Sequence, residues 1–218
     1  MSEFCGKDLT CIRGERRVFG GLGFSLEPGG ALVLIGPNGS GKSSLLRLMA
    51  GLLTQAQGTL TWDGEPTADD PESHGGRLHY VGHLDAVKPM LSVAENISFW
   101  ASLRAAGDGL EGRVTEALSA FGILRLADVP SRFLSAGQKR RVNLARIVAA
   151  PAPLWLLDEP TTALDRATIE GLEGLIARHR SDGGMVVVST HSEMKLDAAQ
   201  SLDLANFTGD MPALDIAL

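Results

Sequence analysis

One glycine-rich segment constrains this chain of 218 residues more than any other feature: Gly36–Ser43 reads GPNGSGKS. It directly follows the apolar run Ala31–Ile35, which is typical of a strand buried on both faces of a parallel sheet. It also opens an expected helix, Lys42–Ala50, which Gly51 ends. This order of strand, turn and helix lets backbone N–H groups surround phosphate oxygens. The sequence therefore predicts an α/β fold built around a phosphate-binding loop.

The side chains of this loop are candidates for holding a nucleotide and its metal ion. Lys42 would place a positive charge on the terminal phosphates, which also makes it a catalytic candidate. The Ser43 hydroxyl is placed to bind Mg²⁺. Because backbone N–H groups contribute as much as side chains, the nucleotide-binding candidates form one continuous set: Gly36, Pro37, Asn38, Gly39, Ser40, Gly41, Lys42, Ser43 and Ser44.

A second segment supplies acidic groups for the same chemistry. The apolar run Leu154–Leu157 predicts another buried strand, and Asp158 and Glu159 follow it. Ligands of open α/β sheets bind at the carboxyl ends of the strands, so both acids are expected at the nucleotide. Asp158 would hold Mg²⁺ through water, and Glu159 would act as the general base on the attacking water. Together with Gly36–Ser43, these acids predict nucleotide hydrolysis with ATP and Mg²⁺.

The rest of the chain alternates strands and helices at both ends and is mainly helical in the middle. This pattern predicts one domain over residues 1–218, with a core at about 1–83 and 151–218 and a helical lobe at about 84–150. Further expected strands are Thr59–Trp62, Leu78–Val81 and Met185–Ser189. One further helix is expected to begin at the capping box of Ser92 and to run toward Ala106. Three more are expected over Arg113–Ala120, Ala136–Ala149 and Arg166–Arg180.

Two shorter features carry weaker expectations. Cys5 and Cys11 are expected on one face of a strand, because side chains alternate with a period of two. The tail after Ala198 shows little periodicity, so a small helix or no regular structure is expected there.

Composition narrows the possible partners. Acidic residues outnumber basic ones by 26 to 20, for a net charge of −6, which argues against a nucleic-acid partner. Glu3, Lys7 and Asp8 stand where a signal peptide needs an apolar stretch. No apolar stretch is long enough to cross a bilayer, so we expect a chain that does not enter the membrane by itself.

The pentapeptide Leu134–Gln138, LSAGQ, resembles the LSGGQ signature of the ATP-binding cassette (ABC) family. The resemblance implies a P-loop NTPase core of the RecA-like type, with an antiparallel β edge and an inserted helical lobe. It also implies a two-fold, ATP-dependent dimer in which these residues bind the γ-phosphate of ATP held by the opposing copy. The neighbouring Lys139, Arg140 and Arg141 are expected on a solvated helix face. The residues implied for the trans site are Leu134, Ser135, Ala136, Gly137 and Gln138.

Four further positions follow from this resemblance. Thr162–Asp165 is similar to the D-loop of the family, which places Asp165 at the dimer seam. His191 matches the switch histidine, which contacts the γ-phosphate and takes part in catalysis. His83 replaces the usual glutamine near Mg²⁺ and is an additional candidate metal ligand. Arg13 replaces the usual adenine-stacking aromatic residue, and its guanidinium plane can stack on a base.

A narrower resemblance is to the ATPase subunit of bacterial cytochrome c maturation, the haem exporter ATP-binding protein. The motifs that carry it are Gly82-His83, Leu134–Val142 and Trp155–Pro160. It implies a peripheral protein on the cytoplasmic face of the inner membrane that docks on integral-membrane subunits, where ATP hydrolysis drives release of a haem-loaded chaperone. The sequence shows no haem ligand set. The alternatives are an ATPase of another small transporter, or a soluble ABC ATPase such as one of iron–sulfur cluster assembly.

Overall fold

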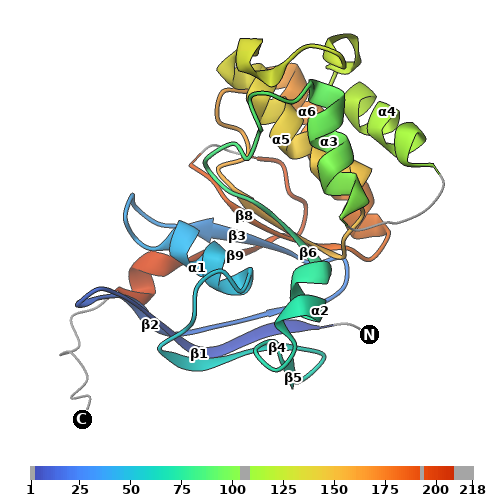
Figure 1. Ribbon diagram of the computed structural model, residues 1–218. Coiled ribbons are helices and arrows are strands. Elements are labelled where there is room, and N and C mark those ends of the chain that lie inside the picture. The colour runs from blue at the N-terminus through green and yellow to red at the C-terminus, as the bar shows by residue number, and fades with distance from the viewer. Residues whose placement is uncertain (1–2, 104–108, 192–193, 209–218) are drawn as a thin grey trace.

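The computed structural model describes residues 3–103, 109–191 and 194–208. Two sheets dominate it (Figure 1). The antiparallel sheet has the order β2-β1-β4-β5, with β1 (Phe4–Arg13), β2 (Arg16–Leu26), β4 (Gln57–Trp62) and β5 (Glu65–Pro66). The parallel sheet has the order β6-β7-β8-β3-β9, with β3 (Ala31–Ile35), β6 (Leu78–Val81), β7 (Leu154–Asp158), β8 (Met185–Ser189) and β9 (Gln200–Asp203).

The helices lie on both faces of the parallel sheet. They are α1 (Lys42–Met49), α2 (Pro71–Gly76), α3 (Val93–Ser102), α4 (Leu110–Ala120), α5 (Ala136–Ala149) and α6 (Arg166–Ser181). Within the described ranges, short 3₁₀ helices span Leu124–Leu126, Ser131–Phe133 and Leu204–Phe207. The α/β class with antiparallel strands is confirmed, and those strands form a sheet of their own. Among the described residues, no helix has the length and hydrophobicity needed to span a bilayer.

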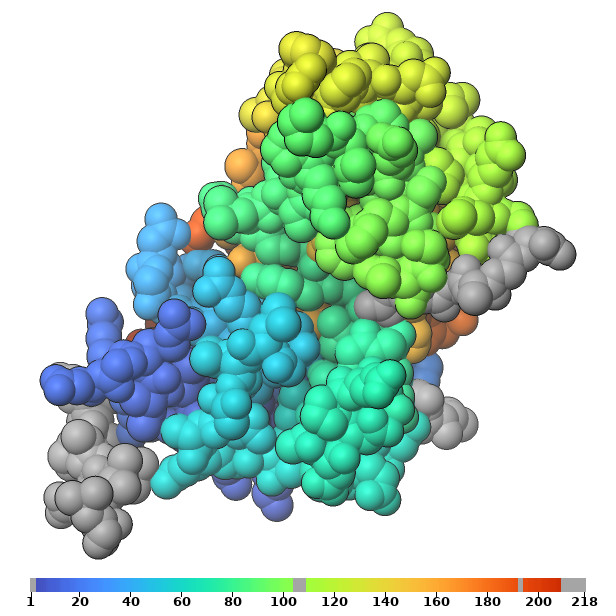
Figure 2. Space-filling model, in the orientation of Figure 1, coloured from blue at the N-terminus to red at the C-terminus, as the bar shows by residue number. Residues whose placement is uncertain are grey.

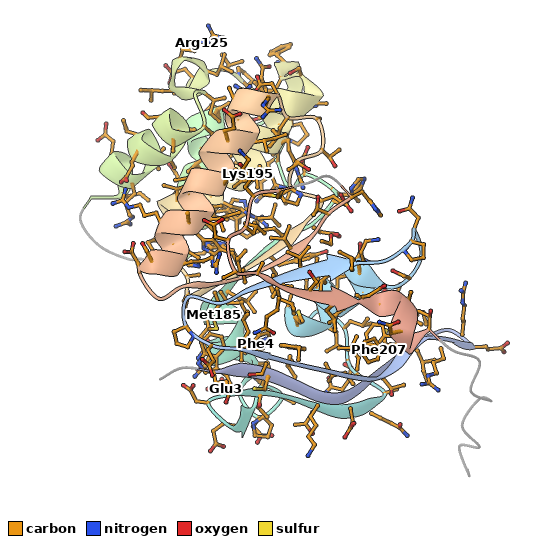
Figure 3. The ribbon with its side chains drawn as sticks, turned by 180° about the vertical axis from the view of Figure 1, so that it is seen from behind. Glu3, Phe4, Arg125, Met185, Lys195 and Phe207 are labelled. Atoms are coloured by element: carbon orange, nitrogen blue, oxygen red, sulfur yellow. The ribbon has the colours of Figure 1, made fainter. Side chains whose placement is uncertain are left out.

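Each central strand of the parallel sheet supports two hydrophobic cores. Leu154 and Leu156 of β7 face the core between the two sheets, where α1 also packs, while Trp155 and Leu157 face the core under α5 and α6. Both faces are therefore buried, which is why these strands read as continuous apolar runs. Figure 3 shows Phe4 and Met185 lying between the two sheets, in the first of these cores.

The helices α3, α4 and α5 pack against one another at one end of the molecule. Figure 2 shows the surface of α3 and α4 as a continuous cap over the sheets. The predicted capping box starts α3: the Glu95 N–H donates to Ser92 Oγ (3.2 Å), and the Ser92 N–H donates to the Glu95 carboxylate (2.7 Å). The expected continuation to Ala106 reaches residues 104–106, which lie outside the described residues.

The prediction that Cys5 and Cys11 share one strand face is wrong. The register of β1 shifts between Gly6 and Leu9, and Asp8 between them has a φ of 52°. This bulge breaks the two-residue period. Leu9 and Cys11 are consequently buried in the core, whereas Cys5 is only half-buried on the other side of the strand.

The tail after Ala198 contains a small helix, as expected, in the 3₁₀ helix Leu204–Phe207, but it also forms the strand β9, which was not expected. Strand β9 pairs in parallel with β3, with Leu202 opposite Leu34. Leu204 is fully buried. The first residues of β9, Gln200 and Ser201, are exposed, so the segment lacks the apolar pattern that marks a buried strand. Pairing with the edge of β3 supplies the order that the local sequence does not predict.

Candidate functional site

The loop between β3 and α1 has the backbone shape that anion binding requires. Gly36, Gly39 and Gly41 have φ values of 132°, 81° and 103°, which residues other than glycine rarely adopt. A Cβ on Gly41 would also lie 2.6 Å from Cγ1 of Val18. No described side chain caps α1 at its N-cap, Gly41. The first N–H groups of α1 therefore remain available for phosphate oxygens.

Lys42 reaches back into this loop. Its Nζ donates to the carbonyl oxygens of Gly36 (2.7 Å) and Pro37 (3.2 Å), and the residue is buried. An ammonium group has three donors, so two hold it in the loop and one remains for a ligand oxygen. The loop thus carries a fixed positive charge at the point where a phosphate chain would lie.

Asp158 lies at the carboxyl end of β7, beside the end of β8. Its Oδ1 accepts hydrogen bonds from Ser43 Oγ (3.1 Å) and Ser189 Oγ (2.6 Å). Its Oδ2 is buried and has no hydrogen-bond partner among the described residues. A buried carboxylate oxygen without a partner is unfavourable. A hydrated Mg²⁺ would satisfy it, and hydroxyl and carboxylate oxygens are donors that Mg²⁺ prefers.

Ser189 was missed in the sequence analysis. It stands directly opposite Asp158 in the parallel register of β7 and β8. In the sequence, Ser189 is only a serine at the end of an apolar strand. It can be recognised as a partner of Asp158 only once β7 and β8 are known to be neighbours.

Glu159 follows Asp158 at a sharp bend, with a φ of 48°. Its backbone N–H donates to the carbonyl oxygen of Ser189 (3.0 Å). Its carboxylate accepts from the His191 backbone N–H (3.3 Å), and the His191 Nε2 lies 3.3 Å from its other oxygen. The glutamate and the histidine therefore face each other, in the arrangement expected of a base and the group that orients it.

Glu159, His191 and most of the phosphate-binding loop line one cavity of about 600 Å³, whereas Asp158 and Ser189 do not. The predicted Arg13 and His83 also line this cavity. The basic side chains at its wall make it suited to a polyanionic ligand. Three lining residues, Arg16, Val18 and Thr162, are not among the predicted site residues. The residues that line the cavity are Arg13, Arg16, Val18, Asn38, Gly39, Gly41, Lys42, Ser43, Ser44, His83, Glu159, Thr162 and His191.

Neither Leu134–Gln138 nor Asp165 lines this cavity. Ser135 is the N-cap of α5: its Oγ accepts from the Gln138 N–H (3.3 Å), and Gln138 Oε1 accepts from the Ser135 N–H (2.9 Å). Ala136 is exposed, so a methyl group is tolerated there. A Cβ on Gly137, by contrast, would lie 2.7 Å from the Ala163 carbonyl oxygen. This contact explains why the second glycine of the signature is kept.

Asp165 contacts both α6 and α5. It is the N-cap of α6 and accepts from the Thr168 N–H (2.9 Å). It also forms an ion pair of 2.6 Å with Arg141. The hydrogen bond with Thr168, helped by the nearby Arg141 charge, lowers the pKa of the Asp165 carboxyl group. Asp165 and Arg141 thus connect the start of α6 with the start of α5.

The expectation that Lys139, Arg140 and Arg141 share a solvated face is wrong for Arg140. Arg140 is 3% exposed. The physical reason is that backbone carbonyl groups from distant segments surround its guanidinium and replace water as acceptors. Burial lowers the pKa of Arg140, and the nearby Asp85 carboxylate opposes this shift.

Comparison with known protein families matches residues 19–162 to the ABC transporter family. The chain belongs to this family. The matched range includes the phosphate-binding loop, the signature residues Leu134–Gln138 and the acids Asp158 and Glu159. As a member of the family, this ABC ATPase binds ATP.

Similar proteins extend the relationship over nearly the whole chain. The chain is 65% identical over 207 residues to the cytochrome c biogenesis ATP-binding export protein CcmA of Rhodospirillum rubrum, covering 95% of this chain and 88% of that protein. It is 62% identical to the protein of the same name from Paramagnetospirillum magneticum, covering 94% and 95%. A solved ATP-binding subunit of an ABC transporter matches with a TM-score of 0.80 and 25% identity, covering 86% of this chain and 79% of that one. A putative ABC transporter ATP-binding protein from Pyrococcus furiosus shares the fold, with a TM-score of 0.79, 23% identity and coverage of 95% and 100%.

Proposed function

We propose that this ABC ATPase is the ATP-hydrolysing subunit of a membrane export complex in cytochrome c biogenesis, where hydrolysis drives release of a haem-loaded chaperone. The names of the relatives and their high sequence identity to this chain support a role in cytochrome c biogenesis. One observation supports the reaction: the phosphate-binding loop and the facing pair of Glu159 and His191 line a single cavity. Beside them, Asp158 keeps a buried oxygen without a partner.

The proposed reaction assigns one task to each group. The loop and Lys42 bind the phosphates, and Arg13 stacks on the adenine. Ser43 would hold Mg²⁺ directly and Asp158 through water, and the ion would neutralise charge on the phosphates. Water attacks the γ-phosphorus, the bond from this phosphorus to the bridging oxygen of ADP breaks, and the water proton moves to Glu159.

We further propose that residues 1–83 and 151–218 act as the nucleotide-binding core, with residues 84–150 as the lobe that meets the membrane subunits. The docking surface would be the loop His83–Leu91 with the adjoining helices, on the cytoplasmic face of the inner membrane. Leu84 and Met90 in this loop are 82% and 73% exposed. Large exposed apolar side chains on a short segment favour an interaction with another protein.

The direct test is phosphate release from Mg-ATP by the purified chain, paired with restoration of c-type cytochromes in a host that lacks its own copy. Hydrolysis together with restoration supports the proposal. Hydrolysis without restoration supports the ATPase of another transporter or a soluble ABC ATPase. No hydrolysis, alone or with membrane subunits, contradicts the enzymatic assignment.

A dimer is the second expectation, because Ser135 and Ala136 are exposed outside the chain's own cavity. Two copies related by a two-fold axis would each place Leu134–Gln138 on the ATP of the other. We expect Glu159→Gln with Mg-ATP to show a mass near twice 23.0 kDa in light scattering. The same variant without nucleotide serves as the control and should be monomeric. A variant that stays monomeric with ATP, both alone and in its membrane complex, would contradict the two-fold site.

His83 allows the docking surface to be tested separately from hydrolysis. We expect His83→Ala to leave ATP affinity nearly intact and to lower the stimulation of ATPase activity by the membrane subunits. The measurement compares the basal rate with the rate in the assembled complex. If the basal rate collapses while complex formation is unchanged, His83 belongs to the metal site. If neither rate changes, His83 only packs against its surroundings.

A further inference from the structure

Arg140 uses every hydrogen-bond donor that its side chain has. A guanidinium carries five N–H groups, and all five have partners although the residue is 3% exposed. The acceptors are four backbone carbonyl oxygens and one carboxylate oxygen. Nε donates to Pro160 O (3.4 Å), Nη1 to Gly82 O (2.8 Å) and Asp85 Oδ1 (3.4 Å), and Nη2 to Asp158 O (2.8 Å) and Glu159 O (2.7 Å).

These five bonds join three segments that are far apart in the sequence. Nη1 holds both ends of the turn Gly82–Asp85, which carries His83. Nη2 and Nε hold the bend that follows β7. Arg140 itself belongs to the second turn of α5. A guanidinium is planar and rigid, so it fixes the turn, the bend and the helix relative to one another. A lysine has three donors on a flexible stem and cannot make the same set of contacts.

The bend that Arg140 holds determines where the Glu159 carboxylate lies. Glu159 has a φ of 48°, a conformation that a residue with a side chain keeps only when its surroundings enforce it. The carbonyl bonds from Nη2 lie at this residue and the one before it. The position of the carboxylate, which lies beside His191, therefore depends on a backbone bend that Arg140 holds.

The turn Gly82–Asp85 is more exposed to solvent than Arg140, to which it is bonded. The Asp85 side chain is 25% exposed, whereas that of Arg140 is 3% exposed. Asp85 also accepts a hydrogen bond from Asn143 of α5 (3.3 Å). If a partner displaced this turn, the buried guanidinium of Arg140 would lose hydrogen-bond acceptors that water cannot replace. Because an unpaired buried charge is costly, we expect the guanidinium to move with the turn.

We propose that Arg140 is a positioning residue that couples the turn Gly82–Asp85 to Glu159, so that displacement of the turn changes the rate of ATP hydrolysis. This inference rests on the ATPase function proposed above. Arg140 lies outside the lining of the nucleotide cavity, so its effect is expected on turnover and not on ATP binding.

The test compares two conservative variants of the full chain, Arg140→Lys and Arg146→Lys. Arg146 lies on the same helix, is 4% exposed, and donates to the Tyr80 carbonyl oxygen. We expect Arg140→Lys to lower kcat by about 10- to 100-fold, the effect of a small displacement of a catalytic group, with the Kd for ATP near that of wild type. Arg146→Lys should keep the wild-type kcat. Thermal unfolding without nucleotide checks that both variants are folded.

A double-mutant cycle tests the coupling itself. Asp85→Ala, which removes the acceptor of Arg140 Nη1, should lower kcat in the wild-type background and have no further effect in Arg140→Lys, because the connection is already broken there. Additive effects, an unchanged kcat in Arg140→Lys, or an equal loss in Arg146→Lys would overturn the proposal. If Arg140→Lys does not fold, Asp85→Ala decides alone: a lower kcat at unchanged Kd supports the coupling, and an unchanged kcat refutes it. Absence of hydrolysis by the wild type would instead refute the proposed function.

Discussion

Glu159→Gln is expected to lower ATP turnover by at least about 100-fold, the lower range of general-base contributions, and to keep the affinity for ATP. An amide cannot accept the proton of the attacking water, but it has nearly the same shape as the carboxylate. The contact with the His191 backbone N–H can be kept by the amide oxygen. Turnover is measured by phosphate release and affinity by equilibrium binding of ATP with Mg²⁺.

The matched control for this variant is Glu170→Gln. Glu170 is an exposed acid on α6 that pairs with Arg166 and lies outside the cavity. It should leave both turnover and affinity unchanged. Substantial hydrolysis by Glu159→Gln would assign the base to another group, and His191 is the next candidate because it lies beside the same position.

Lys42→Ala should differ from Glu159→Gln by weakening ATP binding as well as hydrolysis. A hydrogen bond to a charged group contributes about 1.5–3 kcal/mol, which corresponds to roughly 10- to 100-fold in affinity. The loss of this charge from the terminal phosphates should also abolish hydrolysis. Titration calorimetry with Mg-ATP measures the change in affinity.

Lys7→Ala is the control for the loss of one positive charge. Lys7 is exposed on β1 and does not line the cavity. Its removal should leave ATP binding as it is. A Lys42→Ala variant that binds ATP as tightly as wild type would show that the backbone of Gly36–Ser43 holds the phosphates without it, and the role proposed for the ammonium group would be wrong.

Several elements could be predicted from the sequence because their signals are local. The strand Met185–Ser189 and the helix Ala136–Ala149 have the predicted bounds. The capping box at Ser92 starts a helix where it was expected. The order of strand, glycine loop and helix around Gly36–Ser43 likewise depends on neighbouring residues alone. Backbone preferences, capping and apolar periodicity act within a few residues, so they can be recognised without knowing the fold. The roles of the site residues stay predictions, although the structure brings many of them into one cavity.

Other features were decided by the tertiary structure. Arg140 has the same local signal as its half-buried basic neighbours Lys139 and Arg141, and it is fully buried only because the Gly82–Asp85 turn meets the end of β7 there. Ser189 becomes a partner of Asp158 only through the pairing of β7 with β8. Strand β9 exists because β3 offers it an edge. In each case the stabilising partner lies far away in the sequence, so the free energy that determines the position of the residue is absent from its local pattern.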